Sequence, residues 1–176
     1  MCAIAQQRGA YVFQGDCCTY ECPETFDAVL ALFNVVNYLS IERDLGRGLA
    51  NARRHLNSGG LFIFDTWFED AVISEKPEIR VKRVTHDGLS VVRLAEPVWL
   101  PSRKSVEVNY TVFARSIGEK LWDLTQESHL LNYLSIDLLA RLAEENGFNL
   151  VHVEEMMSGA SPSCKTWNVC VVLVAH

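Results

Sequence analysis

The chain has 176 residues, of which 49% are hydrophobic and 22% are charged, and its formal net charge is −6. This composition excludes a disordered chain and predicts a soluble globular protein with room for a real core. The acidic balance argues against nucleic acid as a partner, because phosphate binding needs clustered lysine and arginine. The sequence shows neither an apolar run of the ~18 residues that cross a membrane nor a signal peptide. We therefore expect a cytoplasmic protein without a membrane partner.

The first third of the chain predicts strands of a parallel sheet. Residues 1–8 resemble the end of a helix, and residues 10–14 read as a strand. The run 26–33 is apolar without alternation, which predicts a second strand buried on both faces, as in a parallel sheet covered by helices. The loop between these strands holds a cysteine cluster but lacks the second CxxC-type pair of a zinc site, so we expect no metal.

A helix and a third strand are expected to complete a βαβ unit. Ser40 is expected to cap the helix, and an apolar stripe at helical spacing runs to Leu56. Gly59 and Gly60 are expected to end the helix, because glycine accepts the left-handed turn found at helix ends. The run 61–64 is a third apolar strand, and connections of this kind are almost always right-handed.

The middle of the chain changes character and predicts an antiparallel meander. Four segments rich in valine, threonine and aromatic residues are separated by turn signals, and several of them alternate polar and apolar residues. Such alternation is typical of antiparallel strands with one face in water. The expected strands cover residues 79–85, 89–99, 105–115 and 120–131.

Helical spacing returns near the C-terminus. Ser135 is expected to cap a helix with a stripe of leucines, and Gly147 is expected to end it. Two further strands, 148–155 and 167–174, are expected to close the chain around a loop. Alternating strands and helices of this kind indicate an α/β protein.

Polar and aromatic side chains follow three of the expected strands. In open α/β sheets, ligands bind beyond the carboxyl ends of the strands. Each group also has an ordinary structural interpretation, as a turn aspartate, a core aromatic residue or an anchor for the meander. Their position at successive strand ends makes them candidates: Gly15-Asp16-Cys17, then Leu32-Phe33-Asn34 with Tyr38, and Asp65-Thr66-Trp67.

Three segments of the sequence carry a resemblance to a known family: "FQGDCCTYECPETFDAVLALFNVVNYL", "ARRHLNSGGLFIFDTWF" and "ESHLLNYLSIDLLARLAEENGF". Their order resembles the second half of a class I S-adenosylmethionine (SAM)-dependent methyltransferase. The meander is similar to the lid of a subgroup that methylates small molecules, including the N,N-dimethyltransferases of amino deoxysugars. The resemblance implies an incomplete Rossmann-like methyltransferase sheet with an inserted antiparallel lid. It divides the chain into core residues 1–74, lid residues 75–134, and the last helix and closing strands, 135–176.

The resemblance implies five residues at the cofactor, S-adenosyl-L-methionine. Asp16 would face the adenine amino group, and the backbone N–H of Cys17 would reach the adenine ring. Leu32 and Phe33 would line the adenosine side. Asn34 would lie near the methyl group that is transferred.

The same resemblance implies a pocket for a small-molecule amine or hydroxyl. Methyl transfer from a sulfonium is an in-line displacement that needs mainly positioning and desolvation, with a base only if the acceptor must lose a proton. Asp65 or His129 would be that base, although His129 lies within an expected strand and also suits a structural role. Tyr38, Trp67 and Tyr133 would complete the acceptor pocket.

Parts of the family pattern are not matched. The family has a Gly-rich loop that cradles the methionine end of SAM and an acidic residue that holds the ribose, and neither precedes Ala10. The chain therefore resembles a methyltransferase truncated at its N-terminus. The family's strand order is 3-2-1-4-5-7-6, so the strand over 26–33 would keep a bare edge, which invites pairing, and we expect a homodimer. Two functions stay open: a methyltransferase, or a non-catalytic remnant that binds a small molecule or another protein.

Overall fold

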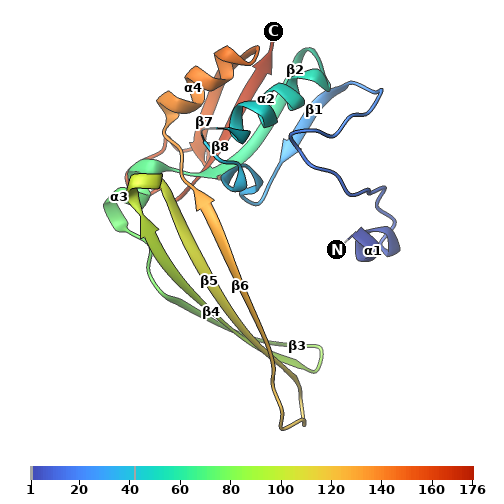
Figure 1. The fold of residues 1–176 in the computed structure, drawn as a ribbon, viewed down its shortest axis with the longest axis vertical. Helices are drawn as coiled ribbons and strands as arrows, with labels where there is room; N and C mark the ends of the chain where they lie inside the picture. The colour runs from blue at the N-terminus through green and yellow to red at the C-terminus, as the bar shows by residue number, and fades with distance from the viewer. Residues whose placement is uncertain (1, 42) are drawn as a thin grey trace.

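The computed structural model describes residues 2–41 and 43–176, and these form two four-stranded sheets (Figure 1). The core sheet has the order β1-β2-β8-β7. Strands β1 and β2 run parallel, whereas β2–β8 and β8–β7 are antiparallel. This order is the 4-5-7-6 half of the expected sheet, and the α/β fold class is confirmed. The four strands are β1 (Phe26–Ala31), β2 (Leu56–Trp67), β7 (Phe148–Glu155) and β8 (Asn168–Ala175).

Two helices, α2 (Asp44–Arg54) and α4 (Ile136–Glu145), cover the same face of the core sheet (Figure 1). Burying their apolar stripes against the sheet removes nonpolar surface from water, which stabilises the fold by about 25 cal/mol per Å². Side chains from both the helices and the strands form this core. They include Leu45, Leu49, Phe62, Phe64, Leu139, Phe148, Val171 and Leu173.

The edge strand β1 is less buried than its apolar sequence predicts. None of its residues is fully buried, and Leu30 is 60% exposed. The prediction of burial on both faces is wrong: Val29 and Ala31 pack against the core, whereas Leu30 on the other face is exposed. Strand β1 also has no described strand on its outer side. The shorter expected strand over 10–14 is also wrong, since these residues form no ladder and follow the short helix α1 (Cys2–Gln7) as irregular chain.

Ser40 does not cap α2. The N-cap residue is Arg43, and the Ser40 carbonyl instead accepts the N–H groups of Asp44 (2.9 Å) and Leu45 (3.0 Å). The Ser40 hydroxyl donates to the Asp44 carboxylate at 2.8 Å. The Ser40 carbonyl therefore closes the turn before the helix, and the Ser40 hydroxyl contacts Asp44, the first residue of the helix.

Gly59 and Gly60 do not end α2, because β2 already begins at Leu56. The ladder between β1 and β2 changes register in this region. Gly59 has φ of 77°, and a Cβ atom at Gly60 would lie 2.9 Å from the carbonyl oxygen of Asn57. The two glycines therefore allow an irregular, closely packed start of β2.

The C-terminal elements match the sequence. The Ser135 hydroxyl accepts the N–H of Leu138 at 3.3 Å and caps α4, and Gly147 follows the helix with φ of 82°. A left-handed glycine after the last turn is the usual way to end a helix. Strands β7 and β8 then close the sheet as expected.

The second sheet is an antiparallel meander that extends away from the core as a long finger (Figure 1). Its order is β3-β4-β5-β6, so every strand pairs with its neighbour in sequence, as predicted. The strands are β3 (Arg80–His86), β4 (Leu89–Leu100), β5 (Ser105–Ser116) and β6 (Asp123–Asn132), and short helices are α3 (Glu69–Glu75), η1 (Val35–Tyr38) and η2 (Pro101–Arg103). No helix among the described residues is long and apolar enough to cross a membrane.

A second, smaller core joins the meander to the central sheet. Tyr133 is 1% exposed, and its hydroxyl accepts a hydrogen bond from Nε1 of Trp99 at 3.2 Å. Beside it, Leu134 donates its N–H to the Trp67 carbonyl and accepts the N–H of Glu69, each at 3.0 Å. The base of the meander is therefore fixed to the core by main-chain bonds as well as by packing.

Candidate functional site

Asp65, at the carboxyl end of β2, holds the turn that follows β1. Both carboxylate oxygens lie 3.1 Å from the backbone N–H of Asn34, and one accepts Nδ2 of Asn168 at 3.0 Å. Asp65 is only 2% exposed. A buried carboxylate needs such donors, because burial without them costs several kcal/mol. The structure thus brings together two predicted site residues, Asn34 and Asp65, and adds Asn168.

The turn after β1 has an unusual backbone. Phe33 has φ of 65° and Asn34 has φ of 59°, so two successive non-glycine residues are left-handed. Such conformations cost about 1–2 kcal/mol each and persist where the surrounding structure holds them. Phe33 is 91% exposed at this turn. The hydrogen bonds from the Asn34 N–H to Asp65 restrain this turn, in which Phe33 is exposed to solvent after the end of β1.

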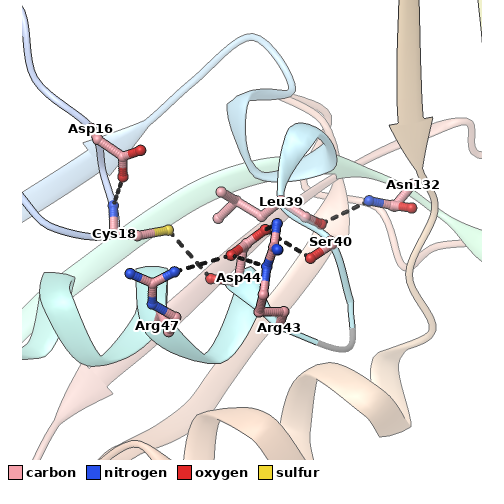
Figure 2. A network of polar contacts seen from close by, with 8 residues as sticks. All are labelled: Asp16, Cys18, Leu39, Ser40, Arg43, Asp44, Arg47 and Asn132. Atoms are coloured by element: carbon pink, nitrogen blue, oxygen red, sulfur yellow. Dashed lines mark hydrogen bonds and ion pairs between the residues drawn. The ribbon is translucent and has the colours of Figure 1, made fainter.

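Asp16 and Cys17 lie in a separate turn against α2. The Asp16 carboxylate accepts the N–H of Cys18 at 2.7 Å, as a turn aspartate does (Figure 2). The Cys18 thiol donates to the Asp44 carbonyl at 3.5 Å, and burial, together with neighbouring Cys17, raises its pKa to about 11. One ligand atom each from Asp16, Cys17 and Cys18 lies within 4.8 Å of the others.

The Asp44 carboxylate anchors the start of α2 beneath this turn (Figure 2). It accepts bonds from Arg43 at 3.0 Å and from the Ser40 hydroxyl at 2.8 Å, and Arg47 lies 3.3 Å away. The bonds from Arg43 and Ser40 lower the pKa of Asp44 to about 2. The carboxylate therefore stays ionised at neutral pH and suits the positive end of the helix.

Tyr38 and His129 meet across the boundary between the core and the meander. The Tyr38 hydroxyl lies 2.8 Å from Nδ1 of His129, and Nε2 of that ring lies 3.2 Å from the carboxylate of Glu127. The Tyr110 ring packs edge-on against the imidazole with centroids 5.4 Å apart. Burial, with Tyr110 and Glu127 nearby, raises the pKa of Tyr38, so its phenol is neutral at physiological pH. A phenol, an imidazole and a carboxylate thus form one hydrogen-bonded chain.

Asn132 fixes the segment that carries Tyr38. Its side-chain amide donates to the carbonyl groups of Asn37 (3.2 Å) and Leu39 (2.7 Å), and Figure 2 shows the bond to Leu39. Asn132 is 8% exposed, and Asn37 is fully buried. These bonds tie the helix η1 to the end of β6, so Tyr38 and His129 are held from the same place.

An open apolar groove of about 510 Å³ lies beside β1 and α2. Cys17 and Leu32 line it, together with Phe13, Tyr20 and His55 of neighbouring segments. Nδ2 of Asn51 donates to the carbonyl groups of Cys17 (2.9 Å) and Tyr20 (3.1 Å), which holds the cysteine turn on the groove's rim. An apolar groove with a carboxylate near its edge suits a flat ring that carries polar edges.

The remaining predicted residues lie at the base of the meander. Trp67 packs edge-on against Trp167 with ring centroids 5.9 Å apart, and both line a second cavity of about 220 Å³. Tyr133 does not line either cavity and is part of the small core. The sequence analysis missed Glu127 and Asn168. Glu127 could have been predicted from the sequence, because it lies two residues before His129 on the same face of a strand.

Comparisons with known proteins show which proteins this chain is similar to. No family model matches the chain. An N,N-dimethyltransferase of dTDP-3-amino-3,4,6-trideoxy-alpha-D-glucopyranose from Streptomyces venezuelae is 28% identical over 103 residues, 58% of this chain and 43% of that protein. The chain thus spans less than half of the length of that curated relative.

Solved structures show the fold over nearly the whole chain. A SAM-dependent methyltransferase from Clostridium acetobutylicum matches with a TM-score of 0.82 and 16% identity, covering 98% of this chain and 68% of the other. DesVI of Streptomyces venezuelae matches with a TM-score of 0.79 and 20% identity, covering 99% and 69%. SAM-bound CalS10, an amino pentose methyltransferase from Micromonospora echinaspora, gives 0.70 and 19%, covering 92% and 63%. The resemblance to SAM-dependent methyltransferases and the Rossmann-like methyltransferase fold are confirmed.

The role of Asp65 as a holder of the turn predicts a specific loss of stability. Asp65→Ala leaves the half-buried Asn34 N–H and Asn168 amide without their acceptor, so we expect a loss of about 2 kcal/mol in the free energy of unfolding in urea. Hydrogen exchange at the Asn34 amide should become faster. Thr66→Val is the matched control, because the Thr66 hydroxyl is buried next door without a hydrogen-bond partner among the described residues. Equal losses in the two variants would contradict the role.

Proposed function

We propose that this chain forms the adenine-binding and acceptor-binding part of a SAM-dependent methyltransferase that acts on a small-molecule amine, such as an amino sugar, or on a hydroxyl. The observation that carries the proposal is the hydrogen bond between Tyr38 of the core and His129 of the meander. The bond supports the proposal because it sets an imidazole beside the segment that follows β1, and ligands bind beyond the carboxyl ends of the strands in sheets of this kind. The similarity to a sugar N,N-dimethyltransferase supports the acceptor class.

We assign five residues to the adenosine part of the cofactor, of which Cys17 and Leu32 line the apolar groove. We assign Asp16 to the adenine amino group and the Cys17 N–H to the ring, since the turn that carries them borders the apolar groove. Leu32 lines the same groove. Phe33 and Asn34 follow it in the restrained turn, which would put them on the side of the ribose and the transferred methyl group. SAM, when bound, supplies an electrophilic methyl group on a sulfonium.

His129 is the residue that we assign as base. The Tyr38 hydroxyl and the Glu127 carboxylate contact its two ring nitrogens, so the ring is oriented from both sides. An amine must lose a proton to become a nucleophile or after methylation, and an imidazole within hydrogen-bond reach accepts that proton. Both ring nitrogens of His129 are bonded as well, so an incoming amine would have to replace Tyr38 or Glu127, and both of these residues are exposed. Asp65 fits this task less well, because it is 2% exposed and its oxygens are bonded to Asn34 and Asn168. Trp67 would lie on the acceptor side, and Tyr133 would support the pocket from behind.

Titration with S-adenosylhomocysteine tests the assigned cofactor site. Asp16→Ala should weaken binding about tenfold, because it removes the acceptor for the adenine amino group. Asp16→Asn removes the charge but keeps an oxygen that accepts the Cys18 N–H. Comparing it with Asp16→Ala therefore distinguishes the effect of the lost charge from the effect of a disrupted turn. Asp87→Ala, in an exposed turn of the meander, should change nothing. Absence of calorimetric binding at millimolar ligand would favour the alternative, a non-catalytic module that binds a small molecule or another protein.

Replacement of His129 tests the assigned base. With a methyl-accepting amino sugar, His129→Gln should lower kcat about 100-fold or more, since positioned general bases contribute about 10²–10⁴. Tyr38→Phe removes only the orienting hydroxyl and should cost less. His152 is the matched control, because its Nε2 also lies 3.2 Å from a glutamate two residues away. If the His129→Gln and His152→Gln variants have the same kcat, His129 is not the base.

We further propose that a second copy of the chain covers the free edge of β1. The strand has an unpaired edge among the described residues and an exposed Leu30, and the apolar groove continues beside it. Antiparallel pairing of two β1 edges about a twofold axis would extend both sheets into one. This arrangement satisfies the main-chain groups of β1 and removes apolar surface from water.

Sedimentation velocity checks the proposed homodimer. The chain should sediment at twice its mass of 19.8 kDa. Leu30→Lys should yield monomers, because it puts a charge on the pairing strand. Val151→Lys is the matched control on β7, the opposite edge strand, where the side chain is 54% exposed. A single-chain mass with a cooperative melt would refute the dimer.

A further inference from the structure

Three potential metal ligands lie together on the turn between α1 and β1. Asp16, Cys17 and Cys18 each place one ligand atom within 4.8 Å of the other two. Two sulfur atoms that bind the same zinc ion lie at most about 4.6 Å apart, because each Zn–S bond is about 2.3 Å long. Only a small movement of the side chains therefore brings them to the spacing that one ion requires. We call Asp16, Cys17 and Cys18 the thiol turn.

Hydrogen bonds fix the main chain of the thiol turn. The Asp16 carbonyl accepts the N–H of Tyr20 at 2.8 Å, and Nδ2 of Asn51 in α2 holds the Cys17 carbonyl at 2.9 Å. One Asp16 carboxylate oxygen accepts the Cys18 N–H (Figure 2), whereas the other has no hydrogen-bond partner among the described residues. A ligand set held in this way loses little conformational freedom when an ion binds.

The charges around the thiol turn favour a cation. The Asp16 carboxylate forms no ion pair within the described part of the chain. Burial, the adjacent thiol and two nearby carboxylates raise the pKa of Cys18 to about 11. The negative groups that oppose loss of the Cys18 proton would stabilise a cation on its sulfur, and a thiol that coordinates a metal is deprotonated. Arg43 and Arg47 pair instead with the Asp44 carboxylate, at 3.0 Å and 3.3 Å.

The types of ligand select the class of ion. Thiolates select zinc and related ions, whereas magnesium and calcium take oxygen ligands. Cys22 is not a further ligand, because its thiol donates to the Glu24 carbonyl at 3.3 Å. The expectation of no metal rests on the lack of a second cysteine pair, which a closed four-ligand site needs. A zinc ion with three protein ligands instead keeps its fourth position open for water.

From this arrangement we propose that the thiol turn binds a zinc ion through its two thiolates and the free carboxylate oxygen of Asp16. When the ion binds, two S–H bonds break, two Zn–S bonds form, and the two protons pass to the solvent. The ion would sit on the rim of the apolar groove, which Cys17 lines. A consequence rests on the proposed function: zinc would take the carboxylate that we assign to the adenine amino group, so metal and cofactor would weaken each other's binding.

Titration of the reduced chain with cadmium tests the site without SAM or turnover, because bonds between cadmium and thiolates absorb in the ultraviolet. The absorbance should saturate, and added zinc should remove it by competition. Cys17→Ser should weaken cadmium binding at least about tenfold, since even changes behind the ligands of a metal site cost about 10–100-fold in affinity. Cys18→Ser should have a similar effect. Cys164→Ser is the matched control, because Cys164 is an equally exposed free thiol outside the cluster.

Absence of saturable absorbance at ~1 mM cadmium, far above a micromolar Kd, or equal weakening by Cys17→Ser and Cys164→Ser, overturns the metal site. Cys17 is exposed, so its serine variant should melt at the same temperature as the parent chain. Titration with S-adenosylhomocysteine, with and without saturating zinc, then tests the shared carboxylate. Zinc should weaken binding about tenfold, and unchanged affinity overturns the sharing. No binding of S-adenosylhomocysteine in either condition, with the cadmium absorbance intact, sustains the metal site and overturns only the proposed function.

Discussion

The main-chain bonds between Trp67 and Leu134 are the constraint on which the rest of the site depends. Leu134 donates its N–H to the Trp67 carbonyl and accepts the Glu69 N–H, so the exit from β2 and the return from the meander are locked together. Asn132, two residues earlier, reaches the carbonyls of η1. Because β6 is paired with β5 along its length up to this junction, the junction sets where His129 lies relative to Tyr38.

The polar groups at the strand ends share one physical problem, which is burial. Asp65 satisfies its carboxylate with donors from a strained turn and from Asn168. Other buried polar atoms there have no partner among the described residues, including both side-chain atoms of Asn37 and the Thr66 hydroxyl. Native proteins keep few such groups, and those that persist commonly mark functional regions or unseen water. The energetic cost is therefore concentrated between the core and the meander, where the proposed chemistry lies.

The two sides of the site differ in polarity. The groove beside β1 is apolar and bordered by the Asp16 turn, whereas the cavity under the meander combines aromatic rings with arginines. Tyr110, which lines the cavity under the meander, contacts the ring of His129. This division suits two ligands of different character that approach one reacting centre from opposite sides.

The sequence by itself determined the order of the elements. Periodicity located the four meander strands, and the Ser135 cap and Gly147 bounded α4 within a residue, because these signals act between neighbours in the chain. The prediction that Gly59 and Gly60 end the helix was wrong, because glycine is found in irregular strands as readily as at helix ends. Tertiary structure alone decided that Tyr38 meets His129, 91 residues away, and that Asp65 holds Asn34. Such contacts depend on how two sheets are joined, and no local pattern encodes that.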